Sequence, residues 1–184
     1  AGSETRRSLK TSTVQHDVIV IGGGLAGLTA GLFAARHGLE TLVLVPLIPG
    51  GCLATIGHIE DFPGFPEGIA GFELGPRVQE QAAQAGAAFQ MAEVTGLTAA
   101  NGGWTLTTID GDLGARTVIV ASGSQPRALG VLGEARLGGR GVSHCASCDG
   151  PLLRGKPVVV AGGGDSGLQE ALALAELGCQ VTVV

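Results

Sequence analysis

Two cysteines separated by two residues are the most reactive side chains in this sequence. Cys145 and Cys148 lie in the stretch GVSHCASCDGPLLRGK, and Asp149 follows them directly. A Cys-x-x-Cys pair can bind a metal, form a permanent crosslink, or form a disulfide reversibly. A carboxyl group beside the second thiol could exchange a proton with a departing thiolate, although an aspartate before a glycine is also common in turns.

Reversible redox chemistry is the use that the surrounding sequence favours. A zinc site needs four ligands, and neither Cys52, Cys179 nor His144 clearly supplements the pair, so we predict no metal. A permanent crosslink would close a very small loop and restrain the unfolded chain little. Thiolate character rises at a helix N-terminus, and Ser143 is a candidate N-cap for a short helix that carries both thiols.

Two copies of one strand–turn–helix–strand unit must position this pair. Residues 17–45 read DVIVIGGGLAGLTAGLFAARHGLETLVLV, and residues 156–184 read KPVVVAGGGDSGLQEALALAELGCQVTVV. Each copy has a short apolar strand, three glycines, a helix and a glycine where a C-terminal cap belongs. In the second helix we expect Leu168, Leu172 and Ala175 to form the apolar face.

Each copy also contains G-x-G-x-x-G, the fingerprint of a dinucleotide-binding turn. The fingerprint glycines are Gly22, Gly24 and Gly27 in the first copy, and Gly162, Gly164 and Gly167 in the second. They permit a tight turn, close approach of a pyrophosphate and close helix packing, while the helix N-terminus attracts phosphate charge. Two such turns predict one bound flavin nucleotide and one exchanging nicotinamide nucleotide. The usual acidic ribose partner is missing after the first copy, where Val45 stands, and Glu40 is poorly placed to replace it.

The fold class that we predict is α/β, with two Rossmann-like dinucleotide-binding domains. The first has a β-meander insertion of the kind common in flavin domains, and the second is incomplete and carries the Cys-x-x-Cys pair. The predicted ranges are a flexible tail at 1–16, the first domain at 17–124 and the second domain at 125–184. Between the two copies we expect a loop at 46–71, a helix at 72–85, and short strands around 89–94, 104–109 and 117–121.

Composition narrows the classes of partner. The 184 residues carry a net charge of −5, which gives no electrostatic reason to bind nucleic acid or an anionic membrane. No apolar run is long enough to span a bilayer, and no secretory signal is visible, so we expect a soluble, cytoplasmic protein. Because the sequence stops inside a predicted strand, we expect it to be a portion of a longer protein.

Several motifs together resemble those of the low-molecular-weight thioredoxin reductases. GGGLAG, PGGCL, IEDFPGFPEGIAGFEL, ASGSQPR, GVSHCASCDG and GGGDSG occur in that family's order and spacing, from about residue 17 onward. The resemblance implies hydride transfer from NADPH to FAD, then reduction of a Cys145–Cys148 disulfide, then exchange with thioredoxin by a homodimer. It implies that Cys148 faces the flavin, Cys145 attacks thioredoxin and Asp149 is the general acid and base.

The same resemblance implies the cofactor contacts. Those to FAD are Gly22, Gly23, Gly24, Leu25, Ala26, Gly27, Gly51, Cys52, Leu53, Asp61, Val94, Ala121 and Gly123, and those to the nicotinamide nucleotide are Gly162, Gly164, Asp165, Ser166 and Gly167. Cys52 and Asp61 depart from the family, which commonly has glutamine and asparagine there, and both replacements remove good hydrogen-bond donors. NADPH is the family's expectation, while Gly167, where alanine is usual, leans weakly towards NADH.

Three other functions remain open at this point. The protein could be the reductase of a peroxiredoxin-type partner, which would use the same core with a different protein acceptor. It could take electrons from ferredoxin, although the second glycine turn argues against this. It could also be a non-enzymatic redox sensor that binds FAD and signals through the cysteine pair.

Overall fold

A computed structural model describes residues 15–100 and 102–184. The chain divides into two compact units, one formed by residues up to Ala54 with Phe72–Gly123, the other by Thr55–Gly71 with Ser124–Val184. Most of the tail expected at 1–16 lies outside the described residues, and the first strand begins at His16. The domain ranges inferred from the sequence stay predictions.

The first unit is built on a six-stranded sheet of order β3-β2-β1-β6-β5-β4. Strands β1, β2, β3 and β6 pair in parallel, whereas β4, β5 and β6 form an antiparallel meander. The elements are β1 (His16–Ile21), α1 (Leu25–Arg36), β2 (Thr41–Val45), a 3-10 turn (Gly51–Thr55), α2 (Gly71–Gln84), β3 (Ala88–Met91), β4 (Val94–Ala100), β5 (Gly103–Thr108) and β6 (Gly111–Val120). This is the α/β architecture that the sequence predicts.

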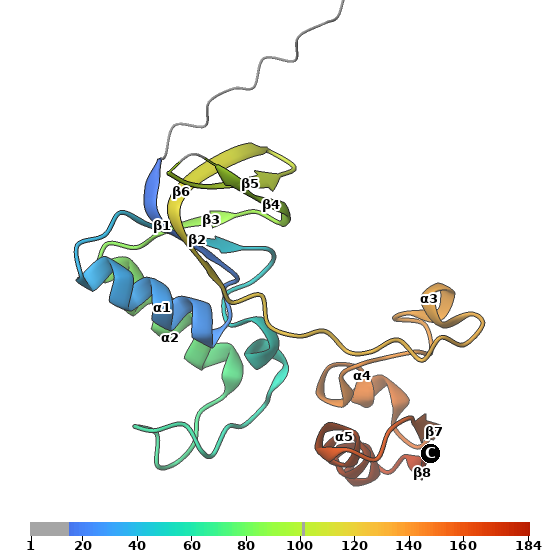
Figure 1. The fold of residues 1–184 in the computed structure, drawn as a ribbon. Coiled ribbons are helices and arrows are strands. Elements are labelled where there is room, and N and C mark those ends of the chain that lie inside the picture. The colour runs from blue at the N-terminus through green and yellow to red at the C-terminus, as the bar shows by residue number, and fades with distance from the viewer. Residues whose placement is uncertain (1–14, 101) are drawn as a thin grey trace, which may run out of the picture. The chain divides into compact units, whose positions relative to one another are not determined.

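Both faces of β1 and β2 are covered, which explains why residues 18–21 and 42–45 are all apolar. On one face Val20 and Val43 pack with Ala34 of α1, and on the other Ile19 and Leu44 pack with Leu106 of β5. Figure 1 shows α1 and α2 together on one side of β1–β3, with the meander on the other. Strands buried on both faces read as continuous apolar runs.

The strand expected around 89–94 is wrong, because the structure has two strands there. β3 ends at Met91 after pairing in parallel with β2, and β4 begins at Val94 and pairs antiparallel with β5. One continuous stretch of sequence thus pairs with two different strands, β2 and β5, and the periodicity of its apolar residues could not show this. The half-exposed antiparallel strand expected around 104–109 is confirmed as β5, in which Leu106 and Thr108 are buried and Trp104 and Thr107 are exposed.

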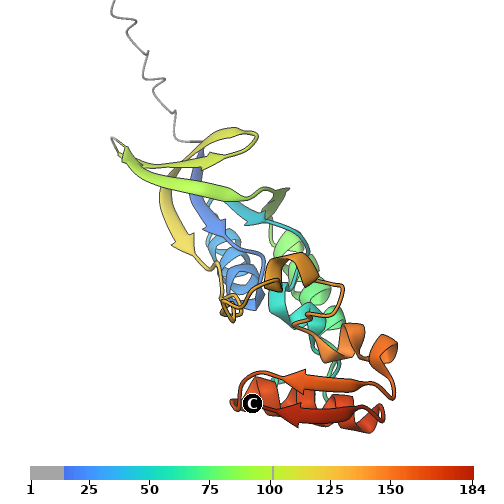
Figure 2. The same ribbon diagram turned by 90° about the vertical axis from the view of Figure 1, so that its right-hand side faces the viewer.

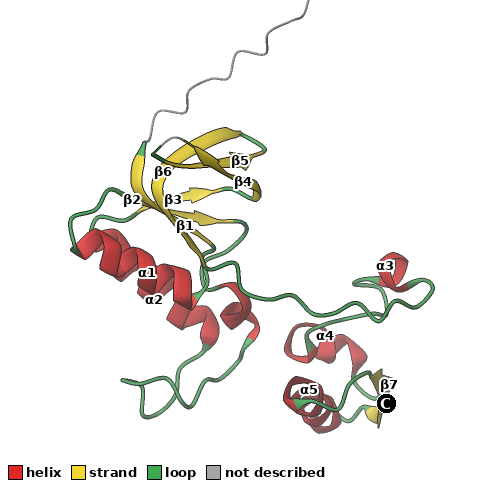
Figure 3. Ribbon diagram, viewed as in Figure 1, coloured by secondary structure: helices red, strands yellow, loops and turns green. Residues whose placement is uncertain are grey.

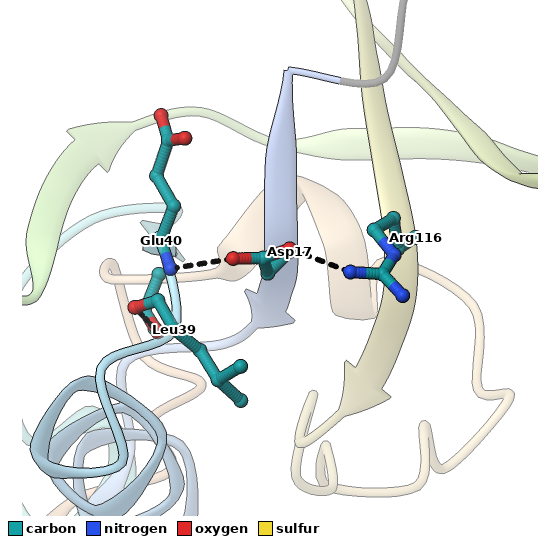
Figure 4. A network of polar contacts seen from close by, with 5 residues as sticks. Asp17, Leu39, Glu40 and Arg116 are labelled. Atoms are coloured by element: carbon teal, nitrogen blue, oxygen red, sulfur yellow. Dashed lines mark hydrogen bonds and ion pairs between the residues drawn. The ribbon is translucent and has the colours of Figure 1, made fainter.

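A polar network ties the strands together at the amino end of β1. Asp17 accepts hydrogen bonds from the Glu40 N–H at 3.0 Å and from Arg116 Nη1 at 3.1 Å (Figure 4). Gly22 bonds Leu44 at the opposite, carboxyl end of the strands, where the glycine turn lies. Glu40 is therefore at the wrong end of β2 to contact a ribose beside that turn, as the sequence indicates.

The second unit contains one short helix, two longer helices that pack together, and a pair of parallel strands. Its elements are α3 (Glu134–Leu137), α4 (Ala146–Leu153), β7 (Pro157–Val160), α5 (Asp165–Glu176) and β8 (Gln180–Val183). Figure 2 shows β7 and β8 side by side, as their register from Pro157 with Gln180 to Val160 with Val183 requires. A long segment without helix or strand joins β6 to α3 (Figure 3).

The apolar face expected for α5 is wrong in its details. Leu168, Leu172 and Ala175 are exposed, and α5 instead buries Ala171 and Leu174. The reason is packing against α4, since a Cβ added to Gly150 of α4 would lie 2.6 Å from Leu177 Cδ1 and 3.5 Å from Leu174 Cδ2. No helix in the described part of the chain is both long and apolar enough to cross a bilayer.

Candidate functional site

The first glycine turn is shaped by close backbone approaches. Gly22 has φ +113° and donates to Leu44 O at 2.9 Å, and a Cβ added to it would collide with the carbonyl oxygen of Ala121. A Cβ added to Gly27 would collide with the carbonyl oxygen of Gly22. The outer two glycines of the fingerprint therefore let α1 and the end of β6 close on the turn.

The middle glycine of this fingerprint leaves space for a ligand. Gly24 is the N-cap of α1, and a Cβ added to it would meet nothing within 4 Å among the described residues. The loop after β2 lies alongside, because Gly50 donates to Gly23 O at 2.7 Å, and a Cβ on Gly51 would lie 3.3 Å from Gly24 Cα. An open helix N-terminus lined by glycine backbone fits the pyrophosphate of a dinucleotide.

The other predicted FAD contacts fall into two groups. Leu25 and Ala26 open α1, Leu53 donates to Gly50 O at 3.1 Å, and Ala121 lies against Gly22, so the structure brings these residues to the turn. The remainder stay predictions: Cys52 is exposed in the 3-10 turn, Val94 packs on the core, Gly123 has φ +72°, and Asp61 is exposed in the segment grouped with the second unit.

The second glycine turn repeats the local geometry of the first. Gly162 has φ +118°, Gly164 is the N-cap of α5, and a Cβ added to Gly167 would collide with the carbonyl oxygen of Gly162. Asp165 and Ser166 form the exposed first turn of α5. This turn too offers an open helix N-terminus that fits a phosphate group.

The cysteine pair is joined as a disulfide at the start of α4, which confirms the expected pairing. The Cα atoms of Cys145 and Cys148 are 5.3 Å apart. Cys145 is half-buried and Cys148 is exposed. Cys145 is itself the N-cap of α4, and its Sγ accepts a hydrogen bond from the Cys148 N–H at 3.1 Å. The expectation that Ser143 caps this helix is wrong, because the backbone of Cys145 is still extended and Ser143 Oγ accepts the Cys145 N–H instead.

A cavity connects this disulfide with the second glycine turn. It has a volume of about 440 Å³, and its lining includes Arg127, His144, Cys145, Ser166, Gly167 and Glu170. Asp149 lies half-buried in the first turn of α4, where its N–H donates to Cys145 O at 3.1 Å. One sulfur of the disulfide and the second glycine turn thus line the same cavity of the second unit.

Two carboxylates at this site were not singled out by the sequence. Glu170 of α5 accepts a hydrogen bond from the N–H of Ala146, the first residue of α4. Glu134 accepts hydrogen bonds from the N–H groups of Leu129 at 2.9 Å and Gly130 at 2.8 Å, and these bonds lower the pKa of its carboxyl. The Glu170 contact depends on how α5 packs on α4, so no local motif signals it, whereas Glu134 bonds residues four and five positions before it in the chain.

Across residues 15–100 and 102–184 there is no group of three or more His, Cys, Asp or Glu side chains that could hold a metal ion. The cysteine pair is engaged in its disulfide.

The chain is similar to known proteins over most of its length. The family model described as pyridine nucleotide-disulphide oxidoreductase matches residues 16–184. A thioredoxin reductase from Treponema pallidum is 41% identical over 92% of this chain and 55% of its own length. A bifunctional thioredoxin reductase/thioredoxin from Mycobacterium leprae is 44% identical over 92% of this chain and 37% of its own length. The crystal structure of Lactococcus lactis thioredoxin reductase matches with a TM-score of 0.85 and 38% identity, over 92% of this chain and 55% of that one. The chain therefore spans about half the length of the first of these relatives.

Proposed function

Because the chain belongs to the pyridine nucleotide-disulphide oxidoreductase family, we propose that it is part of a thioredoxin-disulfide reductase that uses FAD and NADPH. The observation that carries this proposal is the Cys145–Cys148 disulfide at the N-terminus of α4. Cys145 lines the same cavity as the second glycine turn. The thioredoxin reductase relatives, of which one is fused to thioredoxin, support thioredoxin as the acceptor.

The two glycine turns would bind the two dinucleotides. The open N-termini of α1 and α5, behind Gly24 and Gly164, would each bind a pyrophosphate through backbone N–H groups. FAD, when bound, would supply the chemistry of hydride acceptance from NADPH and of two-electron transfer to the disulfide. We assign the first glycine turn to FAD and the second glycine turn to NADPH.

The chain's own side chains would then carry out thiol–disulfide exchange. The Cys145 thiolate attacks the disulfide of oxidised thioredoxin to form a mixed disulfide, and Cys148 attacks Cys145 Sγ to release reduced thioredoxin. Asp149 would protonate the departing thiolate and take the proton back. The N-cap position of Cys145 supports its role as nucleophile, since a helix N-terminus stabilises a thiolate.

We also propose that the protein acts as a homodimer in the cytoplasm. The support for the dimer is the family resemblance. A reducing compartment agrees with Cys179, whose thiol donates a hydrogen bond to Leu153 O.

The test is steady NADPH oxidation by the purified full-length protein on adding oxidised thioredoxin. Cys145→Ser should abolish thioredoxin reduction but leave NADPH able to bleach the flavin colour, and Cys179→Ser is the matched control that should keep full activity. NADH run in parallel decides the nucleotide. Flavin bleaching without turnover, even with thioredoxin in excess, would favour a redox sensor over an enzyme.

A further inference from the structure

The disulfide helix α4 is held on α5 at its beginning, middle and end. At its beginning the Ala146 N–H donates to the carboxylate of Glu170, and Ala146 is only 6% exposed. In its middle Gly150 lies flush against Leu177. At its end the thiol of Cys179, which follows α5, donates to Leu153 O at 3.1 Å. The position of the redox pair therefore depends on α5.

The contact to Glu170 differs from the other two because it brings a negative charge to the helix N-terminus. The first N–H groups of a helix stabilise an anion, with an effect that falls off within the first turn. Glu170 binds the N–H of Ala146, while Cys145 Sγ accepts the N–H of Cys148 in the same turn. After reduction, a Cys145 thiolate would have to share this helix end with a carboxylate, and two like charges so close disfavour each other.

We propose that Glu170 is a positioning residue that fixes the N-terminus of α4 and holds back formation of the Cys145 thiolate. This inference rests on the proposed function, in which the reduced pair donates electrons to a protein disulfide. A dithiol whose thiolate form is less stabilised releases its electrons more readily: the two thiols lose two electrons and two protons, and the partner disulfide gains them. Glu170 thereby makes the pair a stronger reductant.

Other charged and titratable groups also face Cys145 and must stay unchanged in the test. His144 and Asp149 belong to its own segment, and Arg127 lines the same cavity. Glu134 interacts with His144 across this part of the second unit. The substitutions below alter none of these.

The experiment measures the pH profile of Cys145 alkylation by iodoacetamide in the full-length protein carrying Cys148→Ser. In that background the tryptic peptide 141–154 contains Cys145 as its only cysteine, so its modification is read directly by mass spectrometry. Glu170→Gln keeps an oxygen acceptor but removes the charge, and should lower the apparent pKa of Cys145 by about half a unit, an approximately threefold faster reaction on the acid side. Glu176→Gln, the same charge change at an exposed position of α5, should leave the profile unchanged.

Hydrogen exchange of the Ala146 amide tests the positioning role of Glu170 separately from the effect of its charge. Exchange should accelerate in Glu170→Ala, which removes the acceptor, but not in Glu170→Gln. If Glu170→Gln fails to fold, Glu170→Asp retracts the charge by one methylene and should also accelerate exchange. Identical alkylation profiles for the two glutamine variants, or unchanged exchange in Glu170→Ala and Glu170→Asp, would overturn the proposal. Because these readouts need neither NADPH nor thioredoxin, failure of the proposed function would leave them unaffected.

Discussion

The two glycine turns have the same fingerprint but different surroundings. Around the first, Cβ atoms added to Gly22 and Gly23 would run into Ala121 and Val45, so neighbouring strands press on the turn. Around the second, Cβ atoms added to Gly162 and Gly163 would meet nothing within 4 Å among the described residues. What the two turns share is the contact of the third glycine with the first and the open N-cap glycine. The motif thus specifies the turn and the helix start, while the walls of each site come from elsewhere in the chain.

The largest effect should come from adding a methyl group where the first turn is most tightly packed. Gly22→Ala combines a positive φ with a collision against the Ala121 carbonyl, and should lower the free energy of unfolding by about 3 kcal/mol. Gly38→Ala is the control, because its φ of +76° is strained but its surroundings are open, and it should cost only about 1 kcal/mol. Urea denaturation measures both. Equal losses would show that packing by β6 does not shape the turn.

Substitution of either N-cap glycine should weaken dinucleotide binding, but each substitution should affect a different dinucleotide. Gly24→Ala and Gly164→Ala add a methyl group in open space at φ −73° and −80°, so stability should change by less than about 0.5 kcal/mol. Because each methyl would stand where a phosphate approaches the helix, affinity should fall about tenfold or more, equivalent to at least about 1.4 kcal/mol.

Titration of the apoprotein with FAD, and of the holoprotein with NADPH, separates the two turns. Gly24→Ala should weaken only FAD binding, and Gly164→Ala only NADPH binding. The reverse pattern would exchange the two assignments, and no change in either would refute phosphate binding at the turns.

The smallest expected effects are the lowered pKa values of one carboxyl group in each unit. The backbone N–H of Glu40, then Arg116, lowers the pKa of Asp17, and the N–H groups of Leu129 and Gly130 lower that of Glu134. Because the pKa of each carboxyl group is lower in the folded protein than in the unfolded chain, ionisation of the group stabilises the fold. This stabilisation is fully present above the unfolded pKa and is lost as pH falls through the lowered, folded pKa.

Carboxyl carbon shifts followed by NMR against pH test this pair of assignments. Both groups should titrate below the ordinary range for their type. Added salt should raise the pKa of Asp17 more than that of Glu134, because the arginine contributes a screened charge whereas the main partners of Glu134 are neutral. A normal titration of either carboxyl group would contradict its hydrogen bonds.

The sequence predicts most of the local structure that a single segment decides. Both fingerprints, the helices that follow them and the C-terminal glycines Gly38 and Gly178, with φ of +76° and +79°, are as expected. Predictions failed where two segments meet, in the division of one expected strand into β3 and β4 and in the buried face of α5, which packs on α4. Glu170 was missed for the same reason, since its role appears only once α4 is placed on α5. One prediction failed within a single segment, where Cys145 and not Ser143 caps α4.

The central claim is that NADPH delivers electrons to the disulfide between Cys145 and Cys148. The most direct measurement adds NADPH to the purified full-length protein under anaerobic conditions, quenches with an alkylating agent and maps the new thiols by mass spectrometry, with dithiothreitol as the positive control. The account predicts two additional alkylated thiols per chain, at Cys145 and Cys148. Thiols that appear with dithiothreitol but not with NADPH would contradict it.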